Sequence, residues 1–148
     1  MDTTVLGIAE ARASLPSLVD RIGSGALDGV LVGSHRKAEV AIVPLGARGD
    51  DAPVSLARLR RLAQLISRLG LLSGVRDVAV FGSVARGDER TGSDVDLLVD
   101  AAPGTTLFDL AQFQTDMEQL LGTTVDVVTR ASLDPERDRA ILSQAVPL

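Results

Sequence analysis

In the first 45 positions, short apolar runs flank a segment whose apolar residues recur with the period of a helix. Apolar segments at 5–8, 30–32 and 39–43 are typical of strands, and a helix is expected over 9–22. The expected apolar stripe of that helix has the spacing i, i+3, i+4, i+7 and consists of Leu15, Leu18, Val19 and Ile22. We expect Pro16 to interrupt the helix and to begin a second helical piece. The order predicted for this unit is strand, helix, strand, strand.

The rest of the chain alternates longer helical patterns with short apolar runs. Helices are predicted over 55–69, 107–121 and 135–145, and strands over 78–81, 95–99 and 125–128. Thr105 or Thr106 is expected to cap the helix over 107–121, and Gly122 to end it. The polar, glycine-containing stretch 46–53 indicates a linker. The sequence therefore predicts an α+β protein with two units, residues 1–45 and 54–148.

Composition narrows the classes of chemistry that the chain can perform. The 148 residues include no cysteine and one histidine, His35, which excludes disulfides and thiolate metal sites and gives little basis for a His-rich zinc site. No apolar stretch approaches the roughly 18 residues that a membrane span needs. The first residues also lack the basic segment of a signal peptide. We therefore expect a cytoplasmic protein with no membrane partner.

Charge is distributed unevenly along the chain. Residues 71–148 hold six basic and thirteen acidic side chains, whereas residues 46–70 hold five basic and two acidic ones. An acidic surface is poorly suited to contact with a nucleic-acid backbone. If the protein binds DNA, we expect the N-terminal half to make the contact.

Two carboxylates at the start of a predicted strand point to metal chemistry. Gly82 and Ser83 follow one apolar run, and Asp94 and Asp96 open the next run after ten intervening residues. Because residues i and i+2 of a strand point to the same face, the two carboxylates should lie side by side. Such a pair is costly beside a buried segment unless a cation neutralises it. Carboxylate oxygens suit Mg²⁺ shared with substrate phosphates, so the pattern predicts phosphoryl or nucleotidyl chemistry.

Three further residues extend this expectation. Gly82 lets the backbone approach a ligand, and the amides and Ser83 hydroxyl of this turn can bind phosphate oxygens. Arg86 can add charge-assisted hydrogen bonds to a triphosphate. Asp126 lies in the strand predicted at 125–128 and would be a third carboxylate if that strand lies beside the one that carries Asp96. A site for two metal ions is then possible, with Asp126 as ligand, general base or both.

The segment from Phe81 to Val99, with Asp126 downstream, resembles the minimal nucleotidyltransferase group of the polymerase-beta-like superfamily. The resemblance covers residues 54–148. It implies a small mixed sheet with helices packed on one side, Mg²⁺ bound by Asp94, Asp96 and Asp126, and ATP as substrate with pyrophosphate as leaving group. Asp88 and Glu89, in the loop of this motif, are expected to be solvated.

Residues 4–45 resemble the Phd/YefM antitoxin DNA-binding domain, on the segment Ile8–Ile22, the basic turn at Arg36 and Lys37, and the run that ends at Leu45. The turn departs from the usual pattern, because Lys37 and Ala38 follow Arg36 where a glycine is usual. The resemblance implies a β-α-β-β unit that pairs into a homodimer and binds a palindromic operator. Arg12 is the main candidate for DNA contact, with Arg36 and Lys37 in support.

Together the two resemblances imply an antitoxin. Minimal nucleotidyltransferases of this size resemble proteins encoded beside HEPN-type RNase toxins, which they silence by transferring AMP from ATP to a toxin tyrosine. The N-terminal unit would add autoregulation of the operon. Two alternatives remain: a non-catalytic antitoxin and repressor that acts by direct binding, and a nucleotidyltransferase that acts on a small molecule or on RNA.

Overall fold

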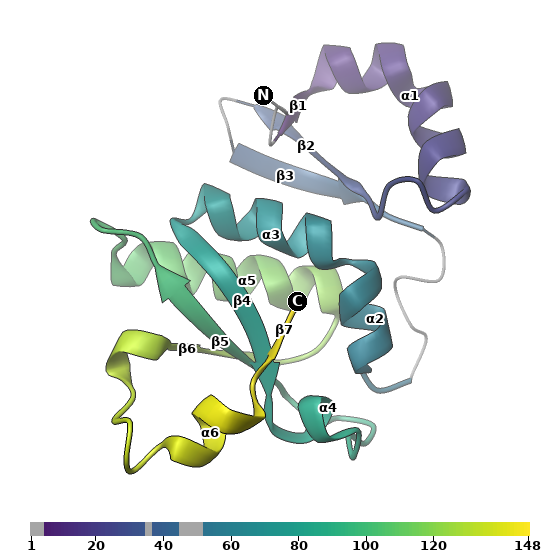
Figure 1. The fold of residues 1–148 in the computed structure, drawn as a ribbon. Helices are drawn as coiled ribbons and strands as arrows, with labels where there is room; N and C mark the ends of the chain where they lie inside the picture. Colours follow the sequence, from purple (N-terminus) through teal and green to yellow (C-terminus); the bar gives the residue numbers. More distant parts are fainter. Residues whose placement is uncertain (1–4, 35–36, 45–51) are drawn as a thin grey trace.

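The structure, a computed structural model, describes residues 5–34, 37–44 and 52–148 and builds them into two mixed β-sheets with helices (Figure 1). The first sheet has the order β1-β2-β3, with β1 (Leu6–Gly7) parallel and β3 (Lys37–Ile42) antiparallel to β2 (Val30–Ser34). The second has the order β6-β5-β4-β7 and holds the motif residues. The α+β class predicted from the sequence is confirmed.

The second sheet consists of β4 (Val75–Phe81), β5 (Val95–Ala101), β6 (Val125–Thr129) and β7 (Val146–Pro147). β5 runs parallel to β6, and β4 is antiparallel to both β5 and β7. Helices α3 (Ala63–Leu72) and α5 (Leu107–Leu121) cover one face of this sheet, with β3 of the first sheet above α3 (Figure 1). The strand β7 was not predicted, because a two-residue strand leaves no periodic pattern to read.

Helix α1 (Ile8–Gly23) is one continuous helix through Pro16, so the predicted division into two helical pieces is wrong, although the helix axis bends about midway (Figure 1). Proline removes one backbone hydrogen bond, and burial of Leu18 and Ile22 against the first sheet anchors the half of the helix that follows Pro16. The predicted apolar stripe is only half right. Leu15 and Val19 are exposed, and the buried residues of the helix are Ala11, Leu18 and Ile22.

The helix predicted over 55–69 is divided at Leu62 into α2 (Leu56–Arg61) and α3. The break frees the Leu65 amide, which donates a 3.0 Å hydrogen bond to Asp28 Oδ2. Because this cap comes from a residue far away in the sequence, no local pattern could reveal it. The predicted apolar stripe is confirmed, since all four of its residues are buried: Leu59, Leu62, Ile66 and Leu69.

One apolar core joins the first sheet to the helices and strands of the second half. Val5 and Leu31 pack in the same buried cluster as Leu59 and Leu65. Next to this core, Arg68 donates a 3.0 Å hydrogen bond from Nη1 to the Gly29 carbonyl. The division into residues 1–45 and 54–148 stays a prediction, and most of the linker expected at 46–53 lies outside the described residues.

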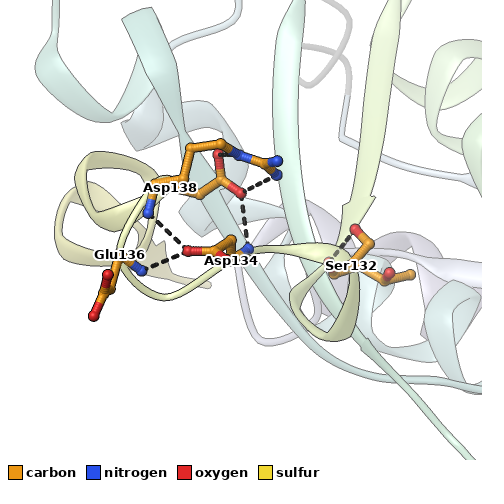
Figure 2. A network of polar contacts seen from close by, with 6 residues as sticks. Ser132, Asp134, Glu136 and Asp138 are labelled. Atoms are coloured by element: carbon orange, nitrogen blue, oxygen red, sulfur yellow. Dashed lines mark hydrogen bonds and ion pairs between the residues drawn. The ribbon is translucent and has the colours of Figure 1, made fainter.

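The end of the chain follows its predicted pattern only in part. Helix α5 has the predicted bounds, with Thr106 and Asp109 forming a capping box and Gly122 in the left-handed region after it. The last helix, α6 (Arg139–Gln144), begins later than expected, because a turn held by Asp134 and Asp138 precedes it. Figure 2 shows Asp134 accepting the amide of Glu136 and donating its own amide to Asp138.

A short 3-10 helix, η2 (Arg130–Ser132), links β6 to that turn, and the five-residue helix α4 (Gly82–Arg86) follows β4. Within the described part of the chain, no helix is both long and apolar enough to cross a membrane.

Candidate active site

Strand register brings three motif residues into one row across the second sheet. Phe81, the last residue of β4, stands opposite Asp96 in β5, and Asp96 stands opposite Asp126 in β6. Gly82 directly follows Phe81, and Asp94 directly precedes β5. The pairing of β5 with β6, on which the third carboxylate depended, is therefore present. Asp94, Asp96 and Asp126 lie at the same end of the sheet.

Asp96 is the electrostatic centre of this row. It is half-buried, whereas Asp94 and Asp126 are exposed. Burial raises the pKa of the Asp96 carboxyl above its ordinary value, and the negative charges of Asp126 and Asp94 raise it further. The positive charge of Arg86 partly offsets this rise in pKa. A bound cation would relieve the same repulsion between the carboxylates.

Gly82 is required at its position by both backbone and space. Its φ of +69° lies in the left-handed region, which disfavours other residues. A Cβ at this position would overlap Oδ2 of Asp96. The backbone of the turn therefore passes directly against the central carboxylate. By contrast, the next left-handed glycine, Gly87, has open space where its Cβ would be.

Helix α4 places Ser83 and Arg86 beside the row. The Ser83 carbonyl accepts the Asp88 amide at 3.0 Å, which closes the short helix. Arg86 Nε lies 3.3 Å from Asp88 Oδ2, in an ion pair whose two side chains are about half exposed. Asp88, expected to be simply solvated, is thus the partner that holds Arg86. The only signal of this contact in the sequence is the pair of opposite charges two residues apart.

The donor chemistry of the row fits a divalent cation. Three carboxylates supply hard oxygen ligands of the kind that Mg²⁺ prefers, and the pKa of Asp96 is raised by burial first and by the charges of Asp126 and Asp94 second. As they stand, the described residues contain no group of three or more acidic or histidine side chains gathered closely enough to enclose an ion. Phosphate oxygens and water complete such sites in proteins that bind Mg²⁺ with nucleotides.

The loop between α4 and β5 contains a carboxylate, that of Glu89, whose burial was not predicted from the sequence. Glu89 was expected to be solvated, but its Oε2 is buried and has no hydrogen-bond partner among the described residues. The loop turns through Arg90 and Ser93, which exchange two hydrogen bonds of 2.9 and 2.8 Å. The Ser93 carbonyl in turn accepts the Thr123 hydroxyl at 3.4 Å. These contacts fix the entry to β5 just before Asp94.

The residues expected to contact DNA lie in the other half of the structure. Arg12 is exposed in the second turn of α1, and Lys37 is exposed at the start of β3. The positive charge of Lys37 reaches Asp116 on α5, where it lowers a carboxyl pKa that burial raises. Arg36 lies outside the described residues.

One cavity of the described structure lies away from the carboxylates. A cavity of about 530 Å³ lies between β3 and helices α3 and α5, with Leu31, Leu69, Leu120 and Asp116 among its lining residues. The row of Phe81, Asp96 and Asp126, with Gly82 directly after Phe81, instead lies at an end of the sheet where Asp94 and Asp126 are exposed.

The known proteins that are similar to this chain match the half that contains Asp94, Asp96 and Asp126. A family profile for the nucleotidyltransferase domain matches residues 59–148. The chain is 40% identical over 76 residues, 51% of its length, to a candidate protein adenylyltransferase of Methanocaldococcus jannaschii, of which 82% is covered. It is 38% identical over 73 residues, 49% of its length, to the protein adenylyltransferase MntA of Thermococcus cleftensis, of which 74% is covered.

A solved structure described as a candidate minimal nucleotidyltransferase is similar to the same half. It superposes with a TM-score of 0.58 at 41% sequence identity, over 64% of this chain and 97% of that chain. The matched profile range includes Gly82, Ser83, Asp94, Asp96 and Asp126.

Proposed function

The chain belongs to the nucleotidyltransferase domain family and is a nucleotidyltransferase, and from this premise we propose that it is the antitoxin of a toxin–antitoxin pair. In this proposal it transfers AMP from ATP to a tyrosine of a HEPN-type RNase toxin and so silences the toxin. The observation that carries the proposal is the pairing of Asp96 with Asp126 across the sheet, with the Gly82 backbone directly against Asp96. The similarity to proteins named protein adenylyltransferases supports a protein as acceptor.

The binding residues follow from the row and from α4. Asp94, Asp96 and Asp126 are the proposed ligands of Mg²⁺, with two ions expected. The Ser83 hydroxyl has no hydrogen-bond partner among the described residues and is available to a phosphate oxygen. Arg86 is proposed to exchange part of its contact with Asp88 for the triphosphate. Bound Mg²⁺ would supply positive charge to the triphosphate and to the acceptor oxygen.

The proposed step is a single transfer at the α-phosphorus of ATP. The tyrosine oxygen of the partner attacks this phosphorus, and a new P–O bond forms. The bond from the same phosphorus to the bridging oxygen breaks, and pyrophosphate leaves with the electron pair. The hydroxyl proton passes to the Asp126 carboxylate or to water. The exposure of Asp126 on an edge strand suits an acceptor that arrives from outside the molecule.

We further propose that residues 1–45 form a Phd/YefM-like unit that dimerises and binds operator DNA. The order β1-α1-β2-β3 supports this proposal, as does the exposed position of Arg12. Ile8, Leu15 and Val19 share the face of α1 that carries Arg12, and all three are exposed. A second copy that covers part of this face would remove the apolar area from water. Because Lys37 faces Asp116, Arg12 is the stronger candidate for DNA contact.

The test of the enzymatic proposal uses the product of the adjacent gene. Purified protein is mixed with that product, ATP and Mg²⁺, and the intact mass of the product is measured. We expect a gain of one AMP on a tyrosine, lost with Asp94→Ala, Asp96→Ala. An unchanged mass, with ATP and Mg²⁺ binding confirmed, would contradict AMP transfer. Neutralisation that survives the double substitution would favour the antitoxin that acts by binding alone.

A further inference from the structure

The strand that carries Asp126 is an edge strand with a side chain on its open side. β6 pairs with β5 alone in the described structure. The Val95 amide donates to the Thr124 carbonyl at 3.0 Å, and backbone groups alternate between the two edges of a strand, so the Val125 amide points away from β5. That amide donates a hydrogen bond to Glu118 Oε1 at 3.2 Å. Glu118 therefore holds the open edge directly before Asp126.

Glu118 occupies a place where helix stability alone would not favour a carboxylate. It lies in the last turn of α5, which contains no basic residue. A negative charge near the C-terminal end of a helix opposes the helix dipole, whereas Lys or Arg there stabilises it. The contact that offsets this cost is the one to the strand. This position indicates that Glu118 stabilises β6, through the Val125 amide, and not its own helix.

The turn between α5 and β6 is anchored on its other side as well. Gly122 ends the helix in the left-handed region, and the Thr123 hydroxyl donates to the Ser93 carbonyl at 3.4 Å. With the bond from Val95 to Thr124, the entry to β6 is tied to β5 on one edge and to α5 on the other. These ties fix the register that sets Asp126 opposite Asp96.

We propose that Glu118 is a positioning residue for Asp126. It binds the first amide of β6 and so keeps the Asp126 carboxylate beside Asp96, without touching nucleotide or acceptor. Occupation of this amide also keeps an outside strand from pairing there. The expected effect on AMP transfer rests on the proposed function, whereas the expected effects on exchange of the Val125 amide and on metal binding do not.

Three substitutions separate the hydrogen bond from the charge. Glu118→Gln keeps an acceptor oxygen at the same reach and loses the charge. Glu118→Asp keeps the charge but is one methylene too short to reach the amide, and Glu118→Ala removes both. Gln119→Ala is the matched control, because this neighbouring side chain is exposed on the same helix turn.

The first readout is hydrogen exchange of the Val125 amide in the full chain, without nucleotide. We expect exchange about five times faster in Glu118→Asp and Glu118→Ala, and close to the parent in Glu118→Gln and Gln119→Ala. Unchanged exchange in Glu118→Asp and Glu118→Ala would overturn the proposal. Equal acceleration in Gln119→Ala would also overturn it, because the effect would then belong to the helix. Glu118→Gln and Glu118→Asp decide the matter even if Glu118→Ala does not fold.

The second readout is the metal site itself. Mn²⁺ binding, followed by water-proton relaxation, should be about tenfold weaker in Glu118→Asp than in Glu118→Gln. In AMP transfer, kcat of Glu118→Asp should be about tenfold lower than that of Glu118→Gln. The KM for ATP should be unchanged, because the substitutions leave Gly82, Ser83 and Arg86 in place. A rise in KM alone would overturn the positioning role. If the parent transfers no AMP, the proposed function fails, while amide exchange and Mn²⁺ binding still decide the role of Glu118.

Discussion

Asp96 and Asp126 stand opposite each other in a hydrogen-bonded sheet, whereas Arg12 stands on an exposed face of α1. The first pair has its geometry fixed by strand register, and its charges act on each other within one molecule. The arginine has no comparable frame in the described structure, and its proposed contact with DNA involves a second molecule. The catalytic half can therefore be tested within one chain, but the N-terminal half only with a second copy or with DNA.

The sharpest test of the catalytic half is the loss of its central carboxylate. Asp96→Asn should lower AMP transfer by roughly a thousandfold, because Asp96 is the innermost of the proposed metal ligands. The control is Asp77→Asn, an exposed carboxylate nearer the opposite end of β4. Initial rates of pyrophosphate release measure the effect. Equal losses of rate in Asp96→Asn and Asp77→Asn would contradict a specific role for Asp96 in AMP transfer.

A second test uses two glycines with the same backbone conformation. Gly82→Ala and Gly87→Ala should each destabilise the fold by about 1 kcal/mol, because both have φ near +70°. Only Gly82→Ala should also displace the Asp96 carboxylate, with a loss of activity of about a hundredfold. Urea unfolding and transfer rates separate the two effects. A Gly82→Ala variant that is destabilised but fully active would show that the close approach to Asp96 is irrelevant to catalysis.

The N-terminal half is tested by its arginines. Arg12→Ala should weaken binding of the protein's own promoter DNA by about tenfold, a typical cost for a lost arginine contact. Arg21→Ala is the matched control, since Arg21 is exposed at the other end of the same helix. Fluorescence anisotropy at fixed salt measures the affinities. Loss of equal size in both variants would indicate a general charge effect and not a contact by Arg12.

The smallest expected effect concerns the contact between the two halves. Burial raises the pKa of Asp116 above its ordinary value of 3.8, so its ionisation costs folding free energy. That term is absent below pH 3.8 and grows as pH rises through the raised pKa. Asp116→Asn should therefore match the parent at low pH and be more stable at pH 7, by less than about 1 kcal/mol because solvent screens the charge. Urea unfolding of both proteins, from below pH 3.8 to pH 7, measures this difference in stability. A parent that is more stable than Asp116→Asn at pH 7 would contradict the prediction.

Sequence patterns predicted local structure well where a single element decides it. The bounds of α5 and its end at Gly122 were predicted because capping residues and apolar spacing lie within that helix. The break at Leu62 was missed because its cap, Asp28, comes from the loop between α1 and β2, far away in the sequence. Helix α1 continues through Pro16, and its buried residues Leu18 and Ile22 anchor only the half after the proline. A long-range contact, and not local propensity, explains the missed break at Leu62.

The candidate site shows the same division. Spacing alone indicated that Asp94 and Asp96 share a face, and it left open whether Asp126 lies beside them until the pairing of β5 with β6 was known. The contact of Glu118 with the Val125 amide had no signal in the sequence, because it depends on how the last turn of α5 meets an edge strand. Glu89 was misjudged for a similar reason, since loop burial is set by neighbours from elsewhere in the chain.

The most direct test of the central claim maps nucleotide onto the protein. Backbone amide resonances are followed as Mg²⁺ and a non-hydrolysable ATP analogue are added to the full chain. The row predicts the largest shifts at Gly82, Ser83, Asp96 and Asp126, and little change in α1 and β3. Shifts concentrated in α1 and β3, or no saturable shift in the row, would contradict the claim that this end of the sheet binds the nucleotide.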